Sequence, residues 1–213
     1  MMMQFYQGPN APFNLDAWDG YPAERNLILD HIKNQSIDNV VVLTGDIHTS
    51  WAADLNPDPF TPFNPLTNEG YNPTTGQGSV AVEFVTPSMT SDNFNEISGT
   101  EPGTSESVES AVMGYNQHIK FVELDDHGYM IVDVDTARVQ TEWYIVDDIL
   151  ISDTAEHRLA MWKVDNKANR LSIGVEPSDE LADVAIAPPA DLEDLDDLSL
   201  NENKRPIAVS YTH

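Results

Sequence analysis

The sequence contains no cysteine in its 213 residues. Disulfide bonds, thiolate metal sites and a cysteine nucleophile are therefore excluded. No run of 18 apolar residues occurs either, which excludes a transmembrane helix. Basic residues are scarce, with 10 Lys and Arg against 36 Asp and Glu, and the net charge is −26. Such a chain repels nucleic-acid phosphate and anionic membrane surfaces, so we expect neither as a partner.

The composition allows one well-packed domain, because 40% of the residues are apolar and the length suits a single core. The strong acidity favours divalent cations, and a solvated acidic surface from a saline habitat would have the same composition. The N-terminus, Met-Met-Met-Gln-Phe-Tyr-Gln, lacks the basic and apolar regions of a signal peptide. It is more typical of the interior of a longer chain, and Met1 to Tyr6 is predicted to form a short apolar strand.

The first half of the sequence predicts an αβ step of a layered sheet. Pro22 suits the first turn of a helix. An apolar stripe follows at helical spacing, formed by Ala23, Leu27, Ile28, Ile32 and Ile37. The helix leads into Val40 to Leu43, whose four apolar residues are typical of a strand buried on both faces. Arg25 lies unfavourably near the positive end of this helix. We therefore expect a specific partner for it, with Asp19 the candidate; the alternative is a solvated arginine.

Two metal-capable side chains, Asp46 and His48, follow this strand directly. Ligands of open sheets bind outside the carboxyl ends of the strands, which is where this pair falls. A carboxylate and an imidazole two residues apart can face one crevice if the backbone stays extended. Both are suitable ligands for Ca²⁺, Mn²⁺, iron or Zn²⁺. The sequence therefore predicts a metal site here, and the alternative is a surface loop with an incidental Asp and His.

The second half predicts a long loop from Asn56 to Gly78, whose aromatic residues either line a cleft or pin the loop to the body. A strand over Ser79 to Val85 and a helix ending near Met113 follow. A β-meander is then predicted, with strands at Ile119–Leu124, Tyr129–Val134, Arg138–Val146, Leu159–Val164 and Arg170–Val175. His127, in the first turn of this meander, is interpreted as structural.

The composition changes after Val175, so the predicted domains are residues 1–175 and an acidic, flexible tail over 176–213. Leucines at positions 192, 195 and 198 leave open a short amphipathic segment that docks on the body or on a partner. This tail allows an alternative function from a different class, a non-catalytic binding module that recruits a basic partner or Ca²⁺.

Several segments carry a further signal through their order and spacing. They are Trp-Asp-Gly-Tyr-Pro-Ala-Glu-Arg (18–25), Val-Val-Leu-Thr-Gly-Asp-Ile-His-Thr-Ser-Trp (41–51), Val-Glu-Phe-Val-Thr-Pro-Ser (82–88), Asn116–Phe121, His127–Tyr129 and Val139–Tyr144. Over residues 1–146 the sequence resembles the C-terminal half of the PhoD-like alkaline phosphatase family. The resemblance implies an α/β (α+β) fold, the C-terminal part of a metallophosphoesterase-like β-sandwich flanked by helices, followed by the meander and the tail.

The resemblance also implies an activity, the hydrolysis of phosphate monoesters and diesters with calcium and iron as cofactors. Many members are exported, so the resemblance implies a periplasmic or extracellular parent protein. Asp46 and His48 match the family's Gly-Asp-x-His motif, whose Asp and His are metal ligands. His118 matches a histidine common in the family and is a candidate for the rim of the site. Arg25 and Asp19 are candidates for positions near the site.

The family's N-terminal metal ligands have no counterpart in these 213 residues. We therefore expect this chain to be an inactive fragment, whose partner is the missing N-terminal part of its own domain. A nucleotidase or nuclease of the same metallophosphoesterase type is a second enzymatic reading.

Overall fold

The computed structural model describes residues 1–6, 15–151 and 155–174, all of which lie within one compact unit, Met1–Pro177. The predicted domain boundary after Val175 and the predicted acidic tail lie outside the described residues. No helix in the described part of the chain is long and apolar enough to cross a membrane.

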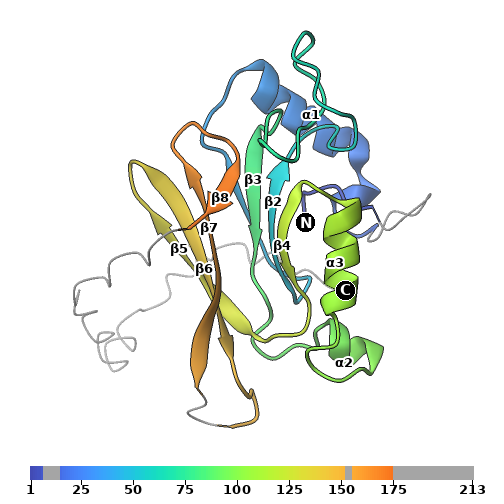
Figure 1. The fold of residues 1–213 in the computed structure, drawn as a ribbon, viewed down its shortest axis with the longest axis vertical. Helices are drawn as coiled ribbons and strands as arrows, with labels where there is room; N and C mark the ends of the chain where they lie inside the picture. The colour runs from blue at the N-terminus through green and yellow to red at the C-terminus, as the bar shows by residue number, and fades with distance from the viewer. Residues whose placement is uncertain (7–14, 152–154, 175–213) are drawn as a thin grey trace, which may run out of the picture. The chain divides into compact units, whose positions relative to one another are not determined.

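The first sheet contains four strands in the order β1-β3-β2-β4 (Figure 1). These are β1 (Val41–Thr44), β2 (Ser50–Leu55), β3 (Ala81–Val85) and β4 (Ile119–Glu123). β1 runs parallel to β3, and β2 runs antiparallel to both β3 and β4. Every residue of β2 and β3 is buried, because layers of other elements cover both faces of these central strands.

The second sheet is an antiparallel meander of β5 (Gly128–Val134), β6 (Arg138–Val146), β7 (Glu156–Asp165) and β8 (Leu171–Ile173). The predicted meander is confirmed over these four strands. Its predicted first hairpin is wrong, because β4 belongs to the first sheet and β5 to the second. The connecting residues pass from one sheet to the other, and the Gly128 amide donates to the Ser88 carbonyl at 3.0 Å instead of pairing with β4.

Helices lie on one face of the first sheet, and the second sheet lies on the other (Figure 1). The helical elements are a 3-10 turn, η1 (Trp18–Gly20), and the helices α1 (Pro22–Asn34), α2 (Phe94–Ser98) and α3 (Glu106–Tyr115). The predicted α+β fold, a β-sandwich flanked by helices, is confirmed.

Two apolar clusters hold the three layers together. On the helix side, Trp51 and Val85 pack with Leu29 of α1 and with Val112 of α3. Between the sheets, Ala52, Val82 and Phe84 pack with Trp143 and Val164. Trp143 is fully buried and its indole Nε1 donates to the Val85 carbonyl at 2.8 Å, so one side chain both fills the interface and hydrogen-bonds across it.

Three local predictions are wrong. β1 is an edge strand, with Leu43 55% exposed, because among the described residues only β3 pairs with it. The buried face of α1 is formed by Arg25, Leu29 and Ile32, whereas Leu27 is 65% exposed. Residues 1–6 form no strand, because the amides of Met2 and Met3 donate to a side chain, that of Glu83.

Candidate functional site

The segment Gly45–Thr49 joins β1 to β2 and carries both predicted metal ligands. It must reverse the chain direction and pass the end of β3 within five residues, since β3 lies between β1 and β2. Asp46 and His48 adopt positive φ angles of 76° and 63°. The backbone is therefore not extended here, although an extended backbone was the condition given above for both side chains to face one crevice. Non-glycine residues in this region are strained by about 1–3 kcal/mol each, and such strain clusters at functional sites.

Asp46 is exposed and lines a cavity of about 410 Å³. The wall opposite the end of β1 comes from the N-terminal residues, among them Met1, Asp16 and Trp18. The Trp18 amide donates to the Met1 carbonyl at 3.2 Å, which holds two parts of this wall together. The Asp46 carboxylate is thus presented to an open space large enough for an ion and its water ligands.

His48 is half-buried and held by one hydrogen bond, between its Nδ1 and the Asp92 carbonyl oxygen at 2.8 Å. A carbonyl oxygen only accepts, so Nδ1 carries the hydrogen. In the neutral ring the lone pair then lies on Nε2. This is the arrangement by which metal-binding histidines are oriented, with one ring nitrogen donating to a fixed acceptor and the other left for the metal.

The predicted partnership of Arg25 with Asp19 is confirmed. Arg25 Nη1 lies 2.5 Å from Asp19 Oδ1, and the two side chains are 2% and 8% exposed. The second oxygen of Asp19 accepts from the Phe5 amide at 3.0 Å. Asp19 adjoins Trp18, so the ion pair fixes η1, the N-terminal residues and α1 against one another behind the wall of the Asp46 cavity.

His118 lies away from Asp46 and His48. It is 1% exposed, and its carbonyl accepts from the Asp54 amide, at the opposite end of β2 from the Gly45–Thr49 segment. Its Nε2 donates to the Gln4 carbonyl at 2.6 Å. Burial lowers the pKa of His118 to about 4, more than the Gln4 carbonyl raises it. His118 is therefore a neutral core residue in this chain.

Glu83 is a positioning residue that the sequence prediction missed. It is fully buried in β3, and its Oε1 accepts from the Thr44 hydroxyl at 2.6 Å and from the Met2 amide at 2.7 Å. Its Oε2 accepts from the Met3 amide at 2.6 Å. Glu83 thus joins the end of β1, just before Asp46, to the N-terminal wall. The signal in the sequence was an acidic residue inside the apolar run that forms β3.

Asp46 and His48 fit a metal ion by chemistry and, for His48, by tautomer. They do not form a complete site by themselves. Within residues 1–6, 15–151 and 155–174, no group of three or more His, Asp or Glu side chains could hold a metal ion.

Comparisons with known proteins identify similar chains. A family model described as PhoD-like phosphatase matches residues 1–143. Alkaline phosphatase D of Bacillus subtilis (strain 168) is 52% identical over 46 residues, which are 22% of this chain and 8% of the relative. A solved structure described as "Structure of PhoD" has a TM-score of 0.64 at 24% identity and covers 84% of this chain. That likeness shows the fold, and this chain spans 30% of the solved chain.

Proposed function

The chain belongs to the PhoD-like phosphatase family, and we propose that it supplies two metal ligands, Asp46 and His48, to a site that hydrolyses phosphate esters. The observation that carries the proposal is the orientation of His48. Its Nδ1–H donates to the Asp92 carbonyl, which leaves Nε2 as a ligand, while Asp46 two residues earlier faces an open cavity. The left-handed backbone at both positions supports the assignment, since strain of this kind is retained where function requires it.

The cofactors we propose are calcium and iron, as in the family. Bound metal ions would supply Lewis acidity and an activated water for attack on phosphorus. The chain's own contribution is orientation: the Asp92 carbonyl fixes the ring of His48, and Glu83 fixes the end of β1 through the Thr44 hydroxyl. The substrate class is phosphate monoesters or diesters.

We infer that the remaining ligands come from an N-terminal part of the parent protein. Two observations support this. The described residues gather no group of three metal-capable side chains, and β1 is an edge strand whose Leu43 is 55% exposed. A further strand added beside β1 would cover that edge and bring its own end beside Asp46. We propose that the chain alone is inactive, and that the parent protein is exported.

Metal titration of the 213-residue chain tests the ligand assignment separately from activity. Calorimetry is expected to show weak binding of Mn²⁺ or Fe²⁺ to the parent chain. We expect His48→Ala and Asp46→Asn each to weaken this binding by about tenfold or more. His31→Ala, at an exposed position of α1, is the matched control and should bind as the parent chain does. Equal affinity in all four proteins would refute the assignment.

Hydrolysis of p-nitrophenyl phosphate and bis(p-nitrophenyl) phosphate tests the rest of the proposal. We expect no metal-dependent turnover from the 213-residue chain and measurable turnover from a longer polypeptide that includes the upstream coding sequence. Activity of the short chain would overturn the fragment proposal. Preference for the monoester or the diester in the longer protein distinguishes an alkaline phosphatase from a nuclease-type relative.

A further inference from the structure

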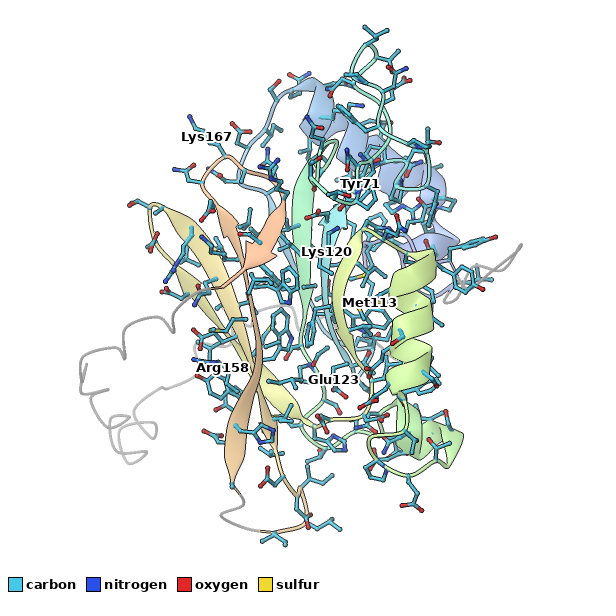
Figure 2. The ribbon with its side chains drawn as sticks, viewed as in Figure 1. Tyr71, Met113, Lys120, Glu123, Arg158 and Lys167 are labelled. Carbon is cyan, nitrogen blue, oxygen red and sulfur yellow. The ribbon has the colours of Figure 1, made fainter. Side chains whose placement is uncertain are left out.

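A second polar hollow lies at the other end of β2, away from Asp46 and His48. It has a volume of about 570 Å³. Its walls are Asp54 of β2, Lys120 of β4, the loop residues 73–77, and Arg170 and Leu171 at the start of β8. The hollow therefore joins both sheets and the long loop. Figure 2 labels Tyr71 and Lys120 on this side of the molecule, where Lys120 Nζ lies 5.2 Å from the centre of the Tyr71 ring.

The acidic residue in this hollow has both of its oxygens occupied by neutral donors. Asp54 is 1% exposed. Its Oδ2 accepts from the Tyr71 hydroxyl at 2.6 Å, and its Oδ1 accepts from the Leu171 amide at 2.7 Å. Asp54 forms no ion pair within 4.0 Å in the described residues, although Lys120 and Arg170 are near enough to lower its pKa. The carboxylate is thus bound by the protein without consuming either cation.

Both basic residues keep donors for a ligand. Lys120 Nζ donates to the carbonyls of Pro73 and Gln117 at 2.9 Å each, which leaves one of its three hydrogens. Arg170 is exposed and makes no hydrogen bond or ion pair with the described residues. Its stem lies over Gly76, where an added Cβ would come within 2.8 Å of Arg170 Cδ. The Arg170 guanidinium thus lies at the hollow, and the backbone of the loop at Gly76 packs closely against the aliphatic part of the Arg170 side chain.

Such a pair of cations is unusual in this chain, which has only 10 basic residues and a net charge of −26. Of the other six basic side chains that the structure describes, four are paired: Arg25, Arg138, Arg158 and Lys163 each lie within 4.0 Å of a carboxylate oxygen. Lys120 and Arg170 differ from them because they line a common hollow and have no such partner in the described residues. A local positive charge on a strongly acidic protein selects for anions.

We propose that the hollow lined by Lys120 and Arg170 binds a small phosphate-bearing anion. The planar guanidinium of Arg170 suits two oxygens of one phosphate group, and the Lys120 ammonium supplies a point charge beside it. The site goes beyond the proposed function and does not depend on it, since it shares no residue with Gly45–Thr49. The ligand has two possible sources, free inorganic phosphate and a phosphate group of a larger polyanion.

Two-dimensional ¹H–¹⁵N NMR of the 213-residue chain tests the proposal. The titration uses inorganic phosphate or tripolyphosphate at about 0.15 M ionic strength, with a chelator present so that metal-bound phosphate does not contribute. We expect saturable shifts of the Gly76 and Leu171 amides. Tighter binding of phosphate identifies the free ion as the ligand, and tighter binding of tripolyphosphate identifies a group of a larger polyanion.

Arg170→Gln carries the test, because this side chain is exposed and substitutions at exposed positions usually change stability little. We expect it to weaken binding by about tenfold or more, the loss of one charge-assisted hydrogen-bond pair. Lys120→Gln should weaken binding as well. Lys167→Gln removes one positive charge outside the hollow, and Asp46→Asn alters the candidate metal segment; both should bind as the parent does. Absence of saturable shifts, or equal weakening by Arg170→Gln and Lys167→Gln, would overturn the proposal.

Discussion

Asp54 is a side chain whose ionisation is linked to its position in the fold. Burial raises its pKa to about 6, against the lowering effects of the Tyr71 hydroxyl, the Leu171 amide, Lys120 and Arg170. The folded state therefore holds a proton on Asp54 between pH 4 and 6, where the unfolded chain has released it. Stability falls as pH rises when the folded state binds more protons. A shift of about two pH units corresponds to about 3 kcal/mol.

Replacing Asp54 by Asn removes this titration while keeping the hydrogen bonds. The Asn oxygen can accept from the Leu171 amide, and its NH₂ group can donate to the Tyr71 oxygen. We expect the stability of Asp54→Asn relative to the parent to rise by about 3 kcal/mol between pH 4 and pH 7. Urea unfolding at several pH values measures it. A stability difference that is independent of pH would contradict the prediction.

Glu83 provides a second test at the same scale. Its two oxygens receive three hydrogen bonds, so Glu83→Gln places an NH₂ group against at least one donor. A buried donor left unsatisfied costs about 1–3 kcal/mol. We expect the free energy of unfolding to fall by this amount, measured by urea at neutral pH. Glu69→Gln, at an exposed loop position, is the control and should change little. If the two variants were equally stable, Glu83 would not be holding β1 to the N-terminal residues.

At the scale of elements, α1 is anchored by a charged pair as well as by apolar contacts. Arg25 is on its buried face with Leu29 and Ile32, and its partner Asp19 lies before the helix. Removing one member of a buried pair leaves the other uncompensated, which typically costs about 3–5 kcal/mol. We expect Arg25→Met to destabilise the protein by about this amount in urea unfolding.

A double-mutant cycle distinguishes this explanation from loss of packing. If the cost comes from an uncompensated carboxylate, adding Asp19→Asn to Arg25→Met restores part of the lost stability. Leu27→Ala, at a position that the sequence pattern placed in the apolar stripe, should change stability by less than about 0.5 kcal/mol because Leu27 is 65% exposed. Strict additivity of the Arg25 and Asp19 substitutions would contradict the pairwise explanation.

The sequence predicted element types well where the local pattern was strong. The helix after Pro22 and the strands of the second sheet were predicted close to their observed bounds, because a proline in the first helical turn and alternation are local signals. The prediction failed where position in a sheet decides the outcome. Val41–Thr44 has the composition of a central strand but lies at an edge, and composition does not report strand order.

The same limit applies to the site. Asp46 and His48 were singled out as candidate ligands because a Gly-Asp-x-His motif follows a strand, which is a local signal. Glu83 contacts residues that are 39 to 81 positions away in the chain. The Asp92 carbonyl contacts His48, which is 44 positions away. No sequence period encodes such contacts. The left-handed backbone at both candidate ligand positions was equally hidden, because the segment has to cross the end of β3.

At the scale of the whole molecule, the net charge of −26 has two possible consequences that composition alone does not separate. Repulsion among many carboxylates destabilises the compact state. Any salt relieves this repulsion, because it shortens the Debye length from about 30 Å at 0.01 M to about 8 Å at 0.15 M. Specific binding of divalent cations would stabilise the folded state by mass action instead. The two consequences differ in which ion matters.

Thermal unfolding in NaCl and in CaCl₂ at matched ionic strength separates them. If screening dominates, both salts raise Tm by similar amounts, and most of the rise occurs below about 0.15 M because the Debye length changes most there. We expect this outcome for the described residues, since they gather no group of three carboxylates or histidines able to hold a metal ion. A rise of about 1 kcal/mol in the free energy of unfolding corresponds to a rise of about 2–4 °C in Tm for a chain of this length. A larger rise in CaCl₂ at equal ionic strength would contradict the prediction and indicate specific calcium sites. A rise confined to high NaCl concentrations would instead indicate strengthened apolar burial.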